Sequence, residues 1–230
     1  MKGFDQFIGS GVPVAAALAI SVLTTQAQNL LVNPGFEDPL LSNPGVNQGW
    51  AAFGTAARSD MMFSVDYPHS GEYSLLAENA PGNNWNPVGV EQIVDGTLRG
   101  FPYAGITPGS PYTFTCWYLT DTGVTMSSVD PVALQIEFLD SAMVSLGTTG
   151  GFNYTLPSND TWYQGSVTAT APAGSTYLVV YAMFMDNGQT TTENVYFDDA
   201  AIMYIPEPSS LMLMSVGLGF LFCLIRSRNN

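Results

Sequence analysis

The sequence predicts an all-β protein, an antiparallel jelly-roll β-sandwich, and three observations lead to this class. Short segments rich in β-branched and aromatic residues alternate with clusters of Gly, Pro, Asn and Asp. Between the two ends of the chain, no stretch shows a sustained apolar period of about 3.6 residues, so we expect little helix. No repeat of roughly 20 to 50 residues is visible, which argues against a propeller or a solenoid.

Alternation of apolar and polar side chains is clearest at 112–118 and 132–138, where we expect each strand to bury one face. Further strands are expected at 73–78, 88–94, 163–170, 177–185 and 195–205. The run Asp186-Asn187-Gly188 predicts the turn between the last two strands. The segments 38–49 and 79–87 are too polar for a core. We expect them to be loops at the ends of the sandwich, where binding residues tend to gather.

The first 27 residues have the features of a secretory signal peptide. Lys2 precedes an apolar stretch at 12–23, and small residues end it at Ala27, after which we expect signal peptidase to cut. A buried helix of the fold is the alternative, but Pro13 and the polar break before Ala27 disfavour it. The folded domain is therefore expected to be exported and to span residues 28–204.

A second apolar segment lies near the C-terminus. Residues 211–225 contain no charge and stop at Arg226 and Arg228. A helix of these residues, rising ~1.5 Å per residue, is about 22 Å long. The hydrocarbon core of a bilayer is roughly 30 Å thick, so this transmembrane helix crosses it only if the arginine side chains snorkel to the head groups or the bilayer thins. Arginines favour the cytoplasmic side, which puts the preceding chain on the outside.

Shortly before that helix, Pro206, Glu207 and Pro208 hold the junction extended, as a protease cleft requires. This triplet, the apolar helix and the terminal arginines together resemble the PEP-CTERM sorting tail of Gram-negative bacteria, over residues 205–230, with Ile205 where valine is commoner. The resemblance implies recognition by an integral-membrane exosortase, cleavage near the triplet, and transfer from a transient inner-membrane anchor to the cell surface or the extracellular matrix. An ordinary anchor with an accidental proline pair is the alternative.

The charge balance excludes a nucleic-acid partner. The chain has 5 Lys and Arg residues against 19 Asp and Glu, a net charge of -14, whereas phosphate binding depends on clustered basic residues. Anionic lipid surfaces are disfavoured for the same reason. Cys116 is the single cysteine of the exported domain, since Cys223 lies in the apolar tail, so no disulfide forms within the domain. We expect Cys116 to be a buried, small hydrophobic residue.

Segments spread over residues 28–204 resemble a carbohydrate-binding module of the galactose-binding-like jelly-roll type. These segments, in chain order, are 29–37, 49–50, 69–75, 108–112, 161–162, 171–174 and 195–199. The resemblance implies a jelly roll that binds polysaccharide and carries a structural calcium ion.

Carboxylates near the first and last strands are the expected metal ligands. In jelly rolls of this type these strands are neighbours, which brings Glu37 close to Asp198 or Asp199. Two unpaired carboxylates repel each other, and a hard cation relieves the repulsion. The resemblance implies a calcium site formed by Glu37, Asp198, the carbonyl of Gly35 and an oxygen from the turn at Gly71. An empty, hydrogen-bonded pair of carboxylates is the alternative.

Two tryptophans are candidate sugar-binding residues. Trp85 lies among asparagines in a polar segment, where an exposed indole offers an apolar face beside amide donors and acceptors. The alternative is that Trp85 folds back onto its own domain. Trp117 points to the face opposite Cys116, where it lines an exposed sheet or serves as a core contact. Trp50 and Trp162 fall at positions that we expect to be structural.

The sequence predicts a protein without catalytic activity. His69 is the only histidine, and the chain contains no Gly-x-Ser-x-Gly, His-Glu-x-x-His or phosphate-loop motif. No pair of carboxylates is singled out for glycoside hydrolysis. We therefore expect an exported surface or matrix protein that binds polysaccharide. A structural or adhesive matrix protein without a defined ligand and a secreted glycan-active enzyme are the alternatives.

Overall fold

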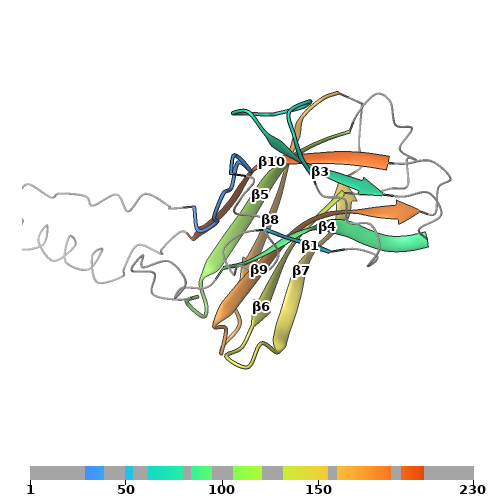
Figure 1. Ribbon diagram of the computed structural model, residues 1–230. Helices are drawn as coiled ribbons and strands as arrows, with labels where there is room; N and C mark the ends of the chain where they lie inside the picture. Colours follow the sequence, from blue (N-terminus) through green and yellow to red (C-terminus); the bar gives the residue numbers. More distant parts are fainter. Residues whose placement is uncertain are drawn as a thin grey trace, which may run out of the picture.

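The computed structural model describes residues 29–38, 50–53, 62–79, 84–94, 106–120, 132–154, 160–187 and 193–204. Two antiparallel sheets pack face to face as the layers of a sandwich (Figure 1). The expected signal peptide, residues 1–27, and the tail, residues 205–230, lie outside the described residues. Within the described ranges, no helix is long and apolar enough to cross a membrane.

Within the described ranges, ten strands make up the two sheets. They are β1 (Ala51–Phe53), β2 (Met62–Ser64), β3 (Ser74–Asn79), β4 (Asn84–Val94), β5 (Pro111–Thr120), β6 (Val132–Leu139), β7 (Ser145–Tyr154), β8 (Tyr163–Thr170), β9 (Tyr177–Asn187) and β10 (Glu193–Tyr204). One sheet has the order β1-β4-β9-β6-β7 and the other β2-β3-β10-β5-β8. From β3 onward, each strand lies in the sheet opposite to that of the strand before it. The exception is β7, which follows β6 in the same sheet as a hairpin. This strand order is a jelly roll, to which β1 and β2 each add an edge strand, and the predicted fold class is confirmed.

All seven predicted strands are confirmed as β3, β4, β5, β6, β8, β9 and β10. The predicted loop 79–87 is wrong at both ends, because Asn79 closes β3 and β4 already begins at Asn84. An irregularity in the pairing between Asn84 and Pro87 accommodates the proline, which has no N–H to donate to the ladder. Asp186 and Asn187, predicted to lie in a turn, instead continue β9.

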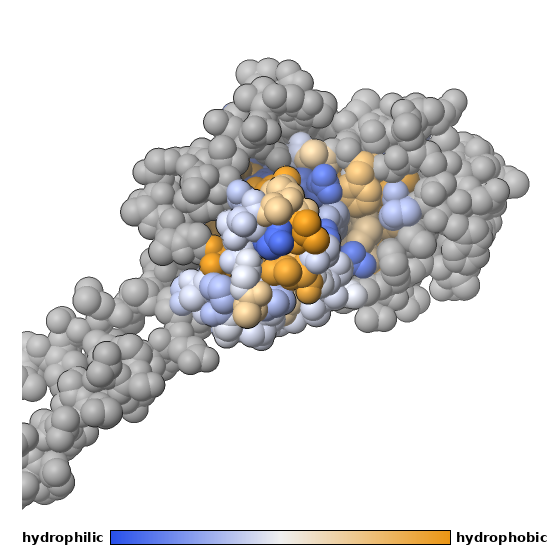
Figure 2. Space-filling view, turned by 90° about the horizontal axis from the view of Figure 1, so that it is seen from below, coloured by the Kyte–Doolittle hydropathy of each residue, from blue (hydrophilic) through white to orange (hydrophobic). Residues whose placement is uncertain are grey.

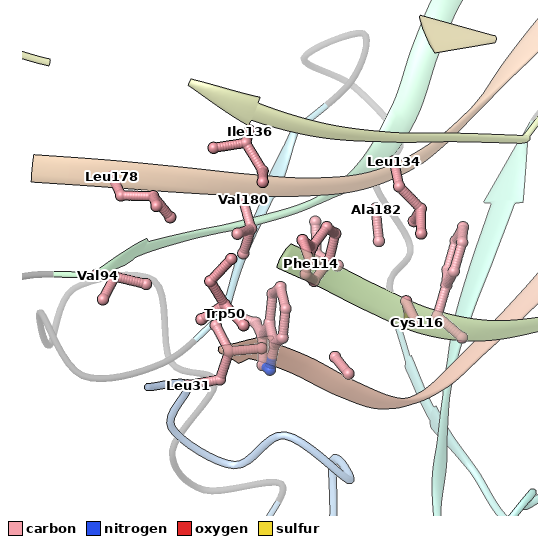
Figure 3. Close-up of a cluster of buried hydrophobic side chains, with 14 of the residues drawn as sticks. Leu31, Trp50, Val94, Phe114, Cys116, Leu134, Ile136, Leu178, Val180 and Ala182 are labelled. Atoms are coloured by element: carbon pink, nitrogen blue, oxygen red, sulfur yellow. The ribbon is translucent and has the colours of Figure 1, made fainter. Parts of the chain in front are cut away.

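The hydrophobic core lies between the sheets, and β5 shows how the sequence forms it. Tyr112, Phe114 and Cys116 point inward and are almost completely buried, while the residues between them face outward. Leu134 of β6 and Val180 of β9 reach them from the opposite sheet (Figure 3). Each large apolar side chain buried in this way contributes about 1.5–3 kcal/mol. Burial also raises the pKa of the Cys116 thiol, as befits the predicted inert core residue.

The segment 29–38 lies beside the last strand, as the resemblance implied. Leu30 donates its N–H to the Ile202 carbonyl at 3.0 Å. The buried side chain of Gln92, on β4, accepts the Val32 N–H at 2.7 Å and donates to the Val32 carbonyl at 2.9 Å. These bonds tie the segment to both sheets, and they bring residues 35–37 toward the middle of β10.

Candidate functional site

The carboxylate of Glu37 fastens the loop at residues 69–73 to the N-terminal segment. Its two oxygens accept the backbone N–H groups of Glu72 at 2.9 Å and Tyr73 at 3.2 Å. Gly71, between His69 and these donors, has φ 66°, and a Cβ at this position would collide with the Glu37 carboxylate. Only glycine satisfies both the backbone angle and the close approach.

Asp198 is fully buried and is held by three backbone N–H groups. Asp199 donates to Oδ1 at 2.7 Å, while His69 and Ser70 donate to Oδ2 at 2.8 and 3.1 Å. Burial raises the pKa of Asp198 to about 6, against the opposing effect of these donors. A bulge in β10 between Asp198 and Ala201, with Asp199 at φ 44°, directs two successive carboxylates toward the same loop.

His69 joins this carboxylate group to the tryptophans. Its Nδ1 lies 2.7 Å from Oδ2 of Asp199. The imidazole stacks on Trp117 with ring centroids 4.1 Å apart, and it meets Trp162 edge-on at 5.3 Å. All five Lys and Arg residues lie outside the described ranges, so His69 is the one basic side chain within them. Trp117 thus faces away from Cys116, as predicted, but one face of its indole is covered by His69.

The part of this outer face around β3 and the adjoining ends of β5 and β10 is also covered, whereas the outer residues of β8 are exposed. Leu76, Leu119 and Tyr196 are almost fully buried there, and they pack against Tyr67 and Trp162. The rings of Tyr67 and Tyr196 lie 4.9 Å apart. The loop between β2 and β3 therefore forms a small second core on the outside of the sheet, in which Tyr67, Trp117 and Trp162 stay partly accessible.

The residues expected to bind calcium come together around the loop at 69–73. A Cβ on Gly35 would lie 3.6 Å from Oδ1 of Asp199 and 3.7 Å from Cγ of Glu37. No three His, Cys, Asp or Glu side chains of the described residues are spaced to hold a metal ion. The expected set contains two carboxylates, Glu37 and Asp198, with backbone oxygens as the remaining ligands. Oxygen atoms are the ligands that calcium prefers. Among the described residues no Lys or Arg lies beside these oxygens, and the carboxylate oxygens of Glu37 and Asp198 accept backbone N–H groups.

The outer face of the other sheet carries a second polar and aromatic group, which the sequence patterns do not single out. The hydroxyl of Tyr181, on β9, donates to Oε2 of Glu137, on β6, at 2.5 Å. Phe53 of β1 meets the Tyr181 ring edge-on at 5.7 Å. The strand register puts Glu91 of β4 on one side of Tyr181 and Gln135 of β6 on the other. One aromatic ring is thus framed by an amide and two carboxylates.

The tyrosine and the acidic residues of this face remain partly accessible, whereas Val179 and Met183 beside them are buried. Burial raises the pKa of Glu91, and the negative charge of Glu137 raises it further. Burial and the hydrogen bond to Glu137 also raise the pKa of Tyr181, which therefore keeps its proton and remains a donor at neutral pH. The alternation of apolar and polar residues along each strand predicts that Tyr181 and the acidic residues face outward. It does not show which strands are neighbours, so it could not predict that these side chains lie together.

Trp85, predicted in a loop, lies on β4 and so belongs to the same strand as Glu91. The sequence favoured a loop because asparagine and proline, which surround Trp85, are uncommon in strands. Of the two candidate tryptophans, Trp85 is thus on the sheet that carries Tyr181, and Trp117 is on the opposite one.

Comparison with known protein families identifies the C-terminal segment. Residues 205–228 match the PEP-CTERM protein-sorting motif. The PEP-CTERM tail contains Pro206, Glu207 and Pro208 together with Arg226 and Arg228, and the prediction of a sorting motif is confirmed. The motif indicates a protein that is exported and carries a membrane-anchored sorting signal. A search of curated protein sequences finds no relative of the chain.

Solved structures share the sandwich fold at low sequence identity. The enzymatically active domain of bacteriophage CBA120 tailspike protein 4 superposes with a TM-score of 0.53 at 14% identity, over 77% of this chain and 21% of the tailspike chain. The chain thus spans about a fifth of that protein. The Stig cyclase Fisc from Fischerella sp. TAU gives a TM-score of 0.51 at 18% identity, over 78% of this chain and 98% of the cyclase. The CBM22-1 xylan-binding domain from Paenibacillus barcinonensis Xyn10C gives 0.47 at 14% identity, over 79% and 97% of the two chains. Fold likeness alone does not choose between binding and catalysis.

Proposed function

We propose that this chain is an exported, non-catalytic protein that binds polysaccharide through the outer face of the sheet β1-β4-β9-β6-β7. The observation that carries the proposal is Tyr181, a partly accessible ring whose hydroxyl is fixed by Glu137 at 2.5 Å. An aromatic ring accepts the apolar face of a sugar, while neighbouring amides and carboxylates pair with its hydroxyl groups. Gln135 and Glu91, beside Tyr181 in the strand register, supply those polar groups.

The net charge of the chain indicates which class of polysaccharide it binds. A net charge of -14 repels anionic polysaccharides, so the proposal is for a neutral or cationic polymer. Trp85 belongs to β4 of the same sheet and stays a candidate contact. Trp117 is the weaker candidate, because His69 stacks on one face of its indole.

The test is retention on a panel of immobilised polysaccharides, with the full chain held in a detergent that has no sugar head group. At least one neutral or cationic polymer is expected to retain the chain. Tyr181→Ala and Trp85→Ala are each expected to weaken that binding about tenfold, which is about 1.4 kcal/mol. The control is Gln164→Ala, an exposed position on β8 in the other sheet, which should leave binding unchanged.

The same assay separates the two alternatives. Retention on no polymer would favour a structural or adhesive matrix protein without a defined ligand. Release of reducing sugar from a retained polymer would favour a glycan-active enzyme, for which Glu91 and Glu137 are the carboxylates that lie on one face. Loss of that release in Glu137→Gln and in Glu91→Gln, with binding retained, would identify the catalytic pair.

We further propose that the PEP-CTERM tail brings the domain to its place of action. Signal peptidase would remove residues 1–27, and the helix at 211–225 would hold the chain in the inner membrane. An exosortase would then cut near Pro206, Glu207 and Pro208 and pass the domain to the surface or the extracellular matrix of a Gram-negative cell. The confirmed sorting motif supports this route.

We also propose a structural calcium ion, held by the carboxylates of Glu37 and Asp198 and by the backbone oxygens of Gly35 and Gly71. When bound, the ion would neutralise carboxylates that have no Lys or Arg beside them within the described residues. The test is the melting temperature in excess calcium and in excess chelator. The wild-type chain should melt higher with calcium, Glu37→Gln should lose this difference, and the control Glu78→Gln on β3 should keep it. An equal melting temperature for the wild-type chain in both conditions would count against the ion.

A further inference from the structure

The C-terminal end of β10 and the β6–β7 hairpin lie at the same end of the sandwich. β10 ends at Tyr204, which pairs with Tyr112 at the start of β5. The ring of Tyr112 meets the ring of Phe138 at 6.0 Å, and Phe138 lies just before the hairpin turn at 140–144. Figure 1 shows this turn as the lowest part of the sandwich.

This end of the sandwich exposes a group of large apolar side chains. Met143, Val144 and Leu146, here called the apolar tip, are 49%, 58% and 37% exposed. Ile93, next to the last residue of β4, is 43% exposed, so four of the five exposed large apolar side chains among the described residues lie at this end. The sequence from 141 to 159 contains no charged residue. Figure 2, viewed from below, shows hydrophobic residues beside hydrophilic ones on the described surface that faces the viewer.

The apolar tip is held in a fixed conformation. Oδ1 of Asp140 accepts the N–H groups of Ala142 at 2.8 Å and Val144 at 2.9 Å. The backbones of Asp140 and Val144 are also bonded, at 3.0 Å, and Met143 has φ 62°, which is uncommon outside glycine. These contacts hold Met143 and Val144 outward, although exposure to water gives apolar side chains no stabilisation.

The segment between β10 and the apolar part of the tail is short, which limits the distance between the apolar tip and the membrane. Six residues, 205–210, separate Tyr204 from the apolar segment at 211–225. Fully extended, they reach at most about 20 Å. While the tail is anchored, this end of the domain therefore stays close to the bilayer surface. The net charge of -14 keeps most of the domain away from anionic lipid, which leaves the uncharged tip as the part suited to contact.

We propose that the apolar tip docks into the lipid interface of the membrane while the PEP-CTERM tail is still anchored. The occupant of this surface is the bilayer rather than a second copy of the chain. Docking would fix the orientation of the domain and keep the cleavage segment at 206–208 next to the membrane, where an integral-membrane protease can reach it. The inference rests on the tail as an anchor and is independent of polysaccharide binding.

The test measures how deeply a fluorescent label sits in the bilayer. The full chain, with Cys223→Ser, carries one labelled cysteine at Met143→Cys, and it is reconstituted in zwitterionic vesicles whose acyl chains bear bromine as a quencher. Cys116 is fully buried and stays unlabelled in the folded chain. The control label is Thr161→Cys at the opposite end, because Asp160 bonds to the Thr120 carbonyl at the far end of β5.

We expect quenching of the label at position 143 to be at least about twofold stronger than at position 161, and we expect Val144→Asp to remove the difference. Equal quenching at the two positions, in chains that float with the vesicles, would overturn the inference. So would a label at position 143 that is shielded in a dimer detected by cross-linking. A chain that fails to float would overturn the anchor, and with it the docking, but not polysaccharide binding.

Discussion

Replacing Gly71 with alanine tests how Glu37 fastens the loop at 69–73. The substitution has two costs. A Cβ at φ 66° costs about 1–2 kcal/mol in backbone energy. The same atom would collide with the Glu37 carboxylate, which accepts N–H groups from Glu72 and Tyr73. Since these bonds are exposed, losing them costs about 1–2 kcal/mol more. We expect the free energy of unfolding to fall by about 2–4 kcal/mol in total.

The matched control is Gly109→Ala. Gly109 has φ 84°, and a Cβ there meets nothing within 4 Å, so this variant carries the backbone cost alone. The difference between the two variants therefore isolates the contact with Glu37, at about 1–2 kcal/mol. For a domain of this size, that difference corresponds to a melting temperature roughly 2–8 °C lower for Gly71→Ala than for Gly109→Ala.

The assay is thermal unfolding of the full chain, followed by circular dichroism in excess chelator, so that a bound cation does not contribute. A second measurement combines Gly71→Ala with Glu37→Gln, which should destabilise by less than the sum of the two single variants, since both weaken the same contact. Equal melting temperatures for Gly71→Ala and Gly109→Ala would mean that the contact with Glu37 does not stabilise the domain.

Further predictions concern buried groups. Because burial raises the pKa of Asp198 from 3.8 to about 6, the folded chain holds this proton more tightly than the unfolded chain. This bound proton contributes up to roughly 3 kcal/mol to the free energy of unfolding. The contribution is complete below about pH 4 and is lost as the pH rises through about 6. Urea unfolding across this range in chelator should show the decline, and Asp198→Asn should flatten it. Tyr181→Phe removes the bond to Glu137 and should lower the free energy of unfolding by about 1 kcal/mol in denaturant titrations; an unchanged value would mean that the bond contributes nothing. The buried Cys116 should react with a thiol reagent only after unfolding, and rapid reaction of the native chain would contradict its burial.

The strands that the sequence predicted are those with strong alternation or a long apolar run. Residues 112–118 alternate because β5 lies between the core and an outer face, and the structure reproduces that pattern. β7 escaped prediction because it is rich in glycine and threonine and its described side chains are exposed, so it carries no periodic apolar signal. β1 and β2 are three residues each, too short to show a period.

One part of the candidate site could be predicted from the sequence, and the other part could not. Glu37 and Asp198 were found because they lie in segments that resemble a known module, and the structure brings both to the loop at 69–73. The group around Tyr181 depends on the pairing of β4, β9 and β6, which come from distant parts of the sequence. Pairing of this kind is a property of the sheet, so neither composition nor spacing along the chain reveals it.

We infer that both ends of the chain are removed and that the sandwich between them is exported. Mass spectrometry of the mature protein from its native host would show whether this is so. We expect a chain that begins at Gln28 and ends near Pro206, Glu207 and Pro208, recovered from the surface or matrix fraction. An intact chain from Met1 to Asn230, recovered from the cytosol, would contradict it.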